Sequence, residues 1–361
     1  MIMNRREFIK TTISSAAGLA LLPNRLSVSI PGINFLQNQK LGRVCAGGEG
    51  ARFDIKAKPD WDSNTLGVVY RDDVIPWYQE VSADVLDYYS VNQRWVETEG
   101  GYVYASFVQP VQNLPNTTIS ELPEANGVKG MWVEITVPVS DLQIDGAPGT
   151  FWLRTAIRPR VYYGQVFWVD QIAANPDGKL LYRLTQLYGA NQEHYWTNAE
   201  SCRVISAEEL SPISPDVEDK KLVVNLLRQT LSCYENGREV FFCRVSTGPK
   251  LAESGWATEP GDHPIWRKLI SLHMSAGGGA GEAFDTPAIA WTSLFTPEGA
   301  AIHTAYWHNE FGFARSHGCV NCRPDDSKWI WRWTLPNVDY IPGDLTVKGM
   351  SVSSRVMVVE S

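Results

Sequence analysis

Two stretches carry the clearest structural signal in this sequence: AAIHT at residues 300–304 and SHGCVNCRPDD at residues 316–326. The first stretch has the apolar pattern of a short strand and carries His303. The second ends in a proline followed by two aspartates. Proline is tolerated in a first helical turn, and acidic side chains there suit the positive end of the helix dipole. We therefore predict a strand, an aromatic loop and a helix over residues 324–333, with Cys319 just ahead of the helix.

Cys319 has the sequence surroundings of a nucleophile. The positive end of the following helix, together with His303 and His317, is expected to favour the thiolate, which is the reactive form of cysteine. The ordinary alternative is a buried, inert thiol, because free cysteine is often buried. The surrounding Ser-His-Gly and the upstream histidine disfavour that alternative.

Strand patterns and turn residues dominate the rest of the chain, so the predicted fold class is mainly β. Asn236-Gly237 is a hairpin signal between strands at 222–234 and 239–247, and it opens a β-rich catalytic domain over residues 222–361. The polar, proline-containing residues 211–221 are predicted to be an interdomain linker.

Two small β modules are predicted before the linker. Residues 42–112 carry strand candidates at 65–70, 75–81, 93–97 and 102–107. The pair Arg94-Trp95-Val96 and Gly101-Tyr102-Val103-Tyr104-Ala105 resembles the last hairpin of a bacterial SH3-like barrel. Residues 113–210 form a second β module, for which an SH3-like fold is one option, with candidates at 131–137, 162–169, 180–187 and 195–196 and a turn at Asn175-Pro176-Asp177-Gly178.

Residues 1–30 are interpreted as a targeting segment. Arg5-Arg6 is followed by Phe8-Ile9-Lys10 and by a short apolar run, which resembles a twin-arginine export signal. The expected location is the cell envelope, in the periplasm or on the outer face of the cytoplasmic membrane. The run is shorter than the roughly 20 residues that span a bilayer, so no transmembrane span is expected. The alternative is an amphipathic helix that happens to carry two arginines.

Composition excludes some classes of function. The 361 residues carry a formal net charge of −8. No basic stripe is present, which argues against a nucleic-acid partner. The six cysteines are too scattered for a disulfide-stapled miniature fold.

The histidine and cysteine motifs resemble the signature of the L,D-transpeptidases, in which a strand histidine precedes Ser/Thr-His-Gly-Cys, a small aliphatic residue, and Asn or Arg. Here the match is His303 with Ser316-His317-Gly318-Cys319-Val320-Asn321. Ser246-Thr247-Gly248 and Thr258-Glu259-Pro260-Gly261 also look like family segments, so the resemblance covers about residues 219 to 350. The sequence departs from the family in a slightly short loop, in Thr304 where Gly or Ser is common, and in Cys322 where an apolar residue is usual.

The resemblance implies a role for each motif residue. His303 would accept the thiol proton, with its ring oriented by the Thr304 carbonyl, and Cys319 would attack a carbonyl. His317, Gly318 and the Cys319 amide would stabilise the oxyanion, while Ser316 and Asn321 would hold the loop or a substrate carboxylate.

The resemblance also implies a substrate. A peptidoglycan stem tetrapeptide would lose D-Ala and acylate the cysteine, and a second stem amine would then give a 3→3 cross-link. Water in place of the amine would make an L,D-carboxypeptidase. Neither a metal nor another cofactor is implied.

Other interpretations of the motifs are weaker. Cys319 and Cys322 form a C-x-x-C, but a thiol-disulfide oxidoreductase would need a βαβ context. His303, His308, His317 and Cys319 match no familiar zinc spacing. The glycines at 277–281 lack the Lys-Ser/Thr of a phosphate loop and predict a mobile loop near the cleft. The competing class of protein is a non-catalytic cell-wall-binding protein.

Overall fold

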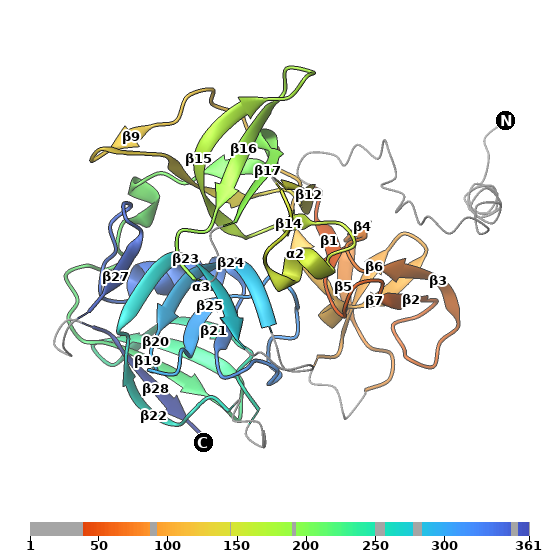
Figure 1. Ribbon diagram of the computed structural model, residues 1–361. Coiled ribbons are helices and arrows are strands. Elements are labelled where there is room, and N and C mark those ends of the chain that lie inside the picture. The colour runs from red at the N-terminus through yellow and green to blue at the C-terminus, as the bar shows by residue number, and fades with distance from the viewer. Residues whose placement is uncertain are drawn as a thin grey trace. The chain divides into compact units, whose positions relative to one another are not determined.

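The computed structural model describes residues 39–86, 92–144, 146–189, 193–249, 257–276, 284–347 and 353–360, and its fold is mainly β, as predicted (Figure 1). Residues 37–361 cluster as one unit. The predicted export signal and the glycine-rich loop at 277–281 lie outside the described residues. Within the described part of the chain, no helix is long and apolar enough to cross a membrane.

The first β module contains two sheets. One has the strand order β4-β1-β8, and the other has the order β3-β2-β7-β6-β5. The strands are β1 (Leu41–Val44), β2 (Arg52–Lys56), β3 (Thr65–Tyr70), β4 (Val74–Pro76), β5 (Gln79–Ser82), β6 (Arg94–Thr98), β7 (Gly101–Tyr104) and β8 (Val108–Val111), with a 3-10 turn η2 at Ala105–Phe107. Val44, Val96 and Val103 lie in its apolar core. The predicted strand at 75–81 is interrupted at residues 77–78, so it forms β4 and β5 instead.

The second β module is built around a six-stranded sheet with the order β13-β17-β16-β15-β11-β18. Its strands are β11 (Met131–Ile135), β13 (Gln143–Ile144), β15 (Val166–Ala174), β16 (Leu180–Thr185), β17 (His194–Asn198) and β18 (Cys202–Val204). The smaller elements are β9 (Glu124–Ala125), β10 (Val128–Lys129), β12 (Val139–Asp141), α2 (Phe151–Thr155), β14 (Arg160–Tyr162), η3 (Ala199–Ser201) and η4 (Glu208–Leu210). The predicted turn is present, because Gly178 N–H donates to the Asn175 carbonyl over 2.9 Å.

The C-terminal part contains two five-stranded sheets, with the orders β21-β20-β19-β28-β22 and β26-β25-β24-β23-β27. The first holds β19 (Lys220–Asn225), β20 (Thr230–Glu235), β21 (Arg238–Arg244), β22 (Gly261–Pro264) and β28 (Arg355–Val359). The second holds β23 (Arg267–Ala276), β24 (Phe284–Leu294), β25 (Ala301–Thr304), β26 (Val320–Cys322) and β27 (Asp344–Thr346). Leu222 and Leu231 of one sheet share a core with Ile302 and Val320 of the other.

The Asn236-Gly237 hairpin is confirmed, and both residues have positive φ angles of 50° and 78°. The predicted strand at 222–234 is nevertheless wrong as one element. A turn after Asn225, whose side chain accepts a hydrogen bond from Arg228 N–H, separates β19 from β20. An irregularity between Cys233 and Tyr234 shifts the register, and Cys233 faces Phe241.

The helix α3 (Pro324–Trp333) has the bounds that the sequence predicts. Two buried lysines satisfy carbonyls at its C-terminal end. Lys268 Nζ donates to Trp331 O and Thr334 O, each at 2.6 Å, and Lys220 Nζ donates to Trp333 O at 3.0 Å. Burial lowers the pKa of both lysines, and that of Lys268 lies well below its usual range.

Replacing Lys268 with methionine is expected to lower the free energy of unfolding by about 2 to 3 kcal/mol, because two buried carbonyls lose their donor. Denaturant unfolding of the variant measures this loss. Lys221→Met is the matched control. Lys221 follows the buried Lys220 in β19, but its own side chain is exposed. Equal stability of the two variants would contradict the capping role.

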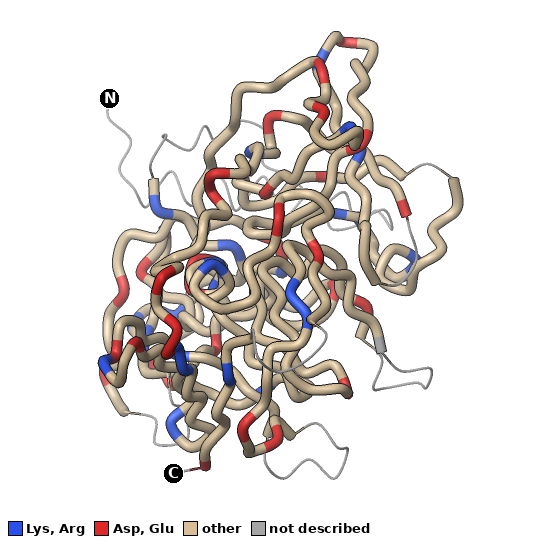
Figure 2. The backbone as a smooth tube through the Cα atoms, turned by 90° about the vertical axis from the view of Figure 1, so that its left-hand side faces the viewer, with Lys and Arg blue, Asp and Glu red and all other residues tan. Residues whose placement is uncertain are grey.

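Lysine, arginine, aspartate and glutamate residues are interspersed along the chain in Figure 2. Several of them form ion pairs within the β modules, such as Arg183 with Asp170 and Arg203 with Glu134.

Candidate active site

The paired strands β25 and β26 bring His303 and Cys319 to the same side of a sheet. The strands are parallel, with Ile302 opposite Val320 and His303 opposite Asn321. Because alternate residues of a strand point to opposite faces, Ile302 and Val320 enter the core while His303 and Asn321 face the other way. Cys319, two residues before Asn321, faces that same side, and all three residues line one cavity.

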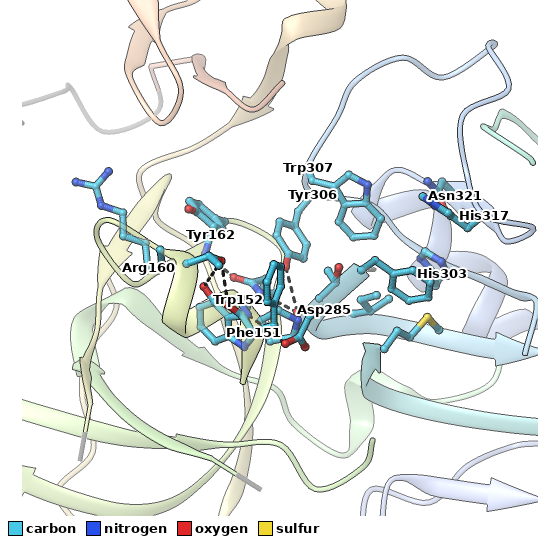
Figure 3. A pocket seen from close by; sticks show the side chains of 18 of the residues that line it. Phe151, Trp152, Arg160, Tyr162, Asp285, His303, Tyr306, Trp307, His317 and Asn321 are labelled. Carbon is cyan, nitrogen blue, oxygen red and sulfur yellow. Dashed lines mark hydrogen bonds between the residues drawn. The ribbon is translucent and has the colours of Figure 1, made fainter. Parts of the chain in front are cut away.

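The cavity has a volume of about 480 Å³ and is lined by all three parts of the described chain (Figure 3). The first module contributes Glu49 and Arg71; the second contributes residues of α2 and β14; the C-terminal part contributes the motif residues and the loop between them. The walls between the motif and β14 are aromatic, with Trp152, Tyr306 and Trp307 among the side chains drawn.

The hydrogen bond of buried His303 decides which of its ring nitrogens carries the proton. Its side chain is 2% exposed, and Nδ1 lies 2.9 Å from the Thr304 carbonyl oxygen. Since a carbonyl can only accept, Nδ1 carries the proton and Nε2 keeps its lone pair. Burial lowers the pKa of His303 to about 4, although the Thr304 carbonyl acts in the opposite direction. The imidazole is therefore neutral and basic at Nε2 at neutral pH.

The Thr304 side chain lies on the opposite face of β25 from His303 and connects this strand to α3. Its hydroxyl hydrogen-bonds Ser327, and the Ser327 hydroxyl donates to the Pro324 carbonyl over 2.9 Å. The side chain at position 304 thus ties β25 to the first turn of α3. A glycine at this position would lack that tie.

Cys319 is a thiol in the resting site. Its side chain is partly exposed and packs beside Leu269, Leu294 and Ala301. Burial raises the pKa of Cys319 to about 11, and a hydrogen bond from the Ala301 backbone only partly offsets this. The expectation that the sequence surroundings favour the thiolate is wrong for this state. The strand β26 separates Cys319 from α3, and the effect of a helix end decays within about one turn.

The rate of Cys319 alkylation by iodoacetamide is expected to rise about tenfold for each pH unit between pH 7 and pH 10, because the thiolate fraction grows until the pH reaches the pKa. Mass spectrometry of the Cys319 peptide measures the rate, with an unstructured cysteine peptide as reference. A rate that is already constant below pH 7 would mean a preformed thiolate–imidazolium pair.

The loop that leads to Cys319 is held by hydrogen bonds to Thr247 and Thr258. These threonines belong to the two other segments that resemble the family. Ser316 N–H donates to Thr247 O over 3.0 Å, and the Ser316 hydroxyl donates to the Cys319 carbonyl over 2.5 Å. The Thr258 hydroxyl donates to Gly318 O over 2.9 Å. Ser316 therefore positions the loop.

Gly318 and its neighbours provide hydrogen-bond donors beside the thiol. Gly318 has a φ of 99°, a left-handed conformation that favours glycine. The backbone N–H groups of Gly318 and Cys319 donate to no other residue within the described ranges. The exposed His317 lies at the cavity wall, with its ring 5.5 Å from that of Phe284.

Asn321 is oriented by a residue that the sequence did not assign to this role, His308. Glu310 N–H donates to His308 Nδ1 over 3.2 Å, so the proton of the neutral ring is on Nε2. Nε2 lies 3.0 Å from the Asn321 side-chain amide, which must therefore present its oxygen there. Asn321 is also part of the cavity lining. No sequence pattern marks His308, because its partner is thirteen residues away.

The loop between the two motifs is anchored on the first β module. Asn309 Nδ2 donates to Ala105 O over 3.0 Å and to Val108 O over 2.9 Å. Buried Arg43 of β1 donates to Tyr306 O and packs over the Tyr162 ring. The first module therefore helps to build the cavity, although no local sequence pattern predicts this contact.

A cysteine thiol just before β26 and an imidazole on β25 line one cavity, and the backbone N–H groups of Gly318 and Cys319 have no acceptor among the described residues. Residues 219–352 match the family model described as the L,D-transpeptidase catalytic domain, YkuD. This C-terminal part of the chain is therefore an L,D-transpeptidase catalytic domain, as the motifs predicted.

Solved structures of L,D-transpeptidases are also similar to the chain. The catalytic domain from Enterococcus faecium is 21% identical, with 39% of this chain and 98% of that chain covered and a TM-score of 0.30. The Mycobacterium smegmatis enzyme is 16% identical, with 67% and 100% covered and a TM-score of 0.31. A mutant of the E. faecium enzyme is 20% identical, with 40% of this chain covered; the match spans only 51% of that chain, with a TM-score of 0.30.

A comparison with curated proteins found no significant match.

Proposed function

We propose that this protein is a peptidoglycan L,D-transpeptidase that forms 3→3 cross-links between stem peptides through a Cys319 thioester. The proposal is carried by one observation. His303 and Cys319 share a face of the paired strands β25 and β26 and line one cavity, with the lone pair of His303 Nε2 available. The YkuD match over residues 219–352 supports the same class of reaction.

In the first half-reaction, His303 Nε2 takes the thiol proton while the sulfur attacks the carbonyl carbon of the diamino acid in a stem tetrapeptide. The N–H groups of Gly318 and Cys319 donate to the oxyanion, a task suited to donors that are aimed in advance. The C–N bond to D-Ala then breaks. The imidazolium gives its proton to the departing amine, a transfer that the low pKa of His303 favours.

In the second half-reaction, the side-chain amine of a second stem attacks the thioester. His303 accepts a proton from the attacking amine and returns it to the sulfur, which leaves as a thiol. The product is a 3→3 cross-linked dimer. Water in the place of the amine gives a tripeptide, so the two products separate the transpeptidase from the carboxypeptidase.

The test is incubation of the full chain with purified tetrapeptide muropeptides and, separately, with a carbapenem. Mass spectrometry should find an acyl adduct on Cys319 that is missing in Cys319→Ala, and chromatography should find the dimer. Folded wild-type protein that gains no adduct from either compound would favour a non-catalytic wall-binding protein.

We also propose that residues 1–30 direct export by the twin-arginine route, so that the enzyme meets its substrate in the cell envelope. Support comes from Arg5-Arg6 and the short apolar run after them. Fusion of residues 1–30 to a reporter should export it, and replacement of both arginines by lysine should stop export. Export that is unchanged in the lysine variant would contradict this route.

A further inference from the structure

The end of the cavity away from the catalytic histidine is rich in arginine. In Figure 3, Arg160 and Tyr162 lie on the opposite side of the cavity from His303 and His317. Four arginines line the cavity: Arg71, Arg158, Arg160 and Arg315. Glu49 and Asp285 are the acidic residues of the lining, and Asp285 is already hydrogen-bonded to buried His273.

Three of the four arginines have an ion-pair partner: Arg158 and Arg160 contact Asp141, and Arg315 contacts Glu310. Arg71 forms no ion pair with another described residue. One of its terminal nitrogens donates to Gly47 O, and its Nε is buried without a hydrogen-bond partner. Burial acts to lower the pKa of Arg71, but Tyr162, Asp72 and Glu49 raise it, and the Tyr162 side chain also hydrogen-bonds the guanidinium.

The neighbouring carboxylate of Asp72 is close enough to raise the pKa of Arg71, but its hydrogen bonds go to other groups. Arg43 Nη1 lies 3.1 Å from Asp72, the Tyr162 hydroxyl donates to it over 3.0 Å, and Arg160 lies at 3.6 Å. The side chain of Asp72 is only 7% exposed. The first module thus presents Arg71 to the cavity, with Glu49 also in the lining and Asp72 buried.

We propose that Arg71 binds a free carboxylate of the peptide substrate while the scissile carbonyl lies at Cys319. This inference rests on the proposed function and names what the first β module contributes to it. A guanidinium presents parallel donors that match a carboxylate. The aromatic walls formed by Trp152, Tyr306 and Trp307 suit the apolar parts of a peptide lying between the two ends.

The experiment uses a series of tetrapeptide muropeptides in which each carboxylate in turn is replaced by a carboxamide. For wild-type protein, one member of the series should acylate Cys319 with a KM about tenfold to a hundredfold higher than the parent, the range expected for a charge-assisted hydrogen bond. Arg71→Gln should show that same higher KM with the parent peptide, with kcat little changed, and should no longer distinguish the two peptides. Arg71→Lys should recover part of the loss.

Arg52→Gln is the matched control, because Arg52 is an exposed arginine of β2 outside the cavity lining, and its KM should stay at the wild-type value. Wild-type protein that treats every carboxamide peptide like the parent would overturn the inference, whatever the stability of the variants. So would an Arg71→Gln variant that keeps the discrimination. In both cases the Cys319 adduct still forms, whereas failure of the proposed function would leave no adduct with any peptide.

Discussion

Replacement of His303 by glutamine is expected to slow the acylation of Cys319 by about 10²- to 10⁴-fold at pH 7, the range for loss of a general base. Glutamine can fill the space but cannot accept the thiol proton. The thiol needs that acceptor, because burial raises the pKa of Cys319 to about 11. Single-turnover mass spectrometry with a tetrapeptide substrate measures the rate.

The pH dependence of His303→Gln separates a chemical role from a structural one. Its acylation rate should rise as the pH approaches 11, since the thiolate then forms without a base, whereas wild-type acylation should decline only near pH 4, where His303 becomes protonated. His263→Gln is the control, because this histidine does not line the cavity. A His303→Gln enzyme with the wild-type rate at pH 7 would exclude His303 as the base.

Replacement of Asn309 by aspartate is expected to lower the free energy of unfolding by about 3 to 5 kcal/mol, the cost of leaving a buried charge unpaired. The change is nearly isosteric, but it places a carboxylate oxygen against the carbonyls of Ala105 and Val108, which now accept from Nδ2. The loop that carries Tyr306 and Trp307 should then leave the first module. We expect KM for peptide to rise and the alkylation rate of Cys319 to stay unchanged.

Asn175→Asp is the matched control. The Asn175 side-chain oxygen accepts hydrogen bonds from the N–H groups of Asp177 and Lys179, and an aspartate oxygen can accept them equally well. Its unfolding free energy should stay near the wild-type value. If Asn309→Asp were as stable as Asn175→Asp, the anchoring of the loop would be unimportant.

Elements with a local cause were predictable from the sequence. Proline and two aspartates mark the start of α3, and Asn236-Gly237 marks the hairpin between β20 and β21. The family of the C-terminal part was also predictable, because its motif residues lie close together in sequence.

Features that depend on distant packing were not predictable. Asn309 finds its acceptors more than 200 residues away, and Arg43 reaches Tyr306 over a similar separation. The state of the Cys319 thiol depends on apolar neighbours from three strands, whose effect exceeds that of the helix and histidines close in sequence. The contact between His308 and Asn321 was not predictable for the same reason, because thirteen residues separate the two.

The segment from His303 to Asn321 both holds the base beside the nucleophile and forms a wall of the cavity. The hydrogen-bonded pairing of β25 with β26 makes the first role independent of the second. The chain between Thr304 and Ser316 can change in length or composition without moving the base relative to the sulfur, since both stay attached to the sheet. An insertion of one residue between Cys319 and Val320 would instead turn Val320 toward the cavity and Asn321 toward the core. Variation in substrate preference among related enzymes should therefore concentrate in the loop, while the strand that follows the nucleophile keeps its length.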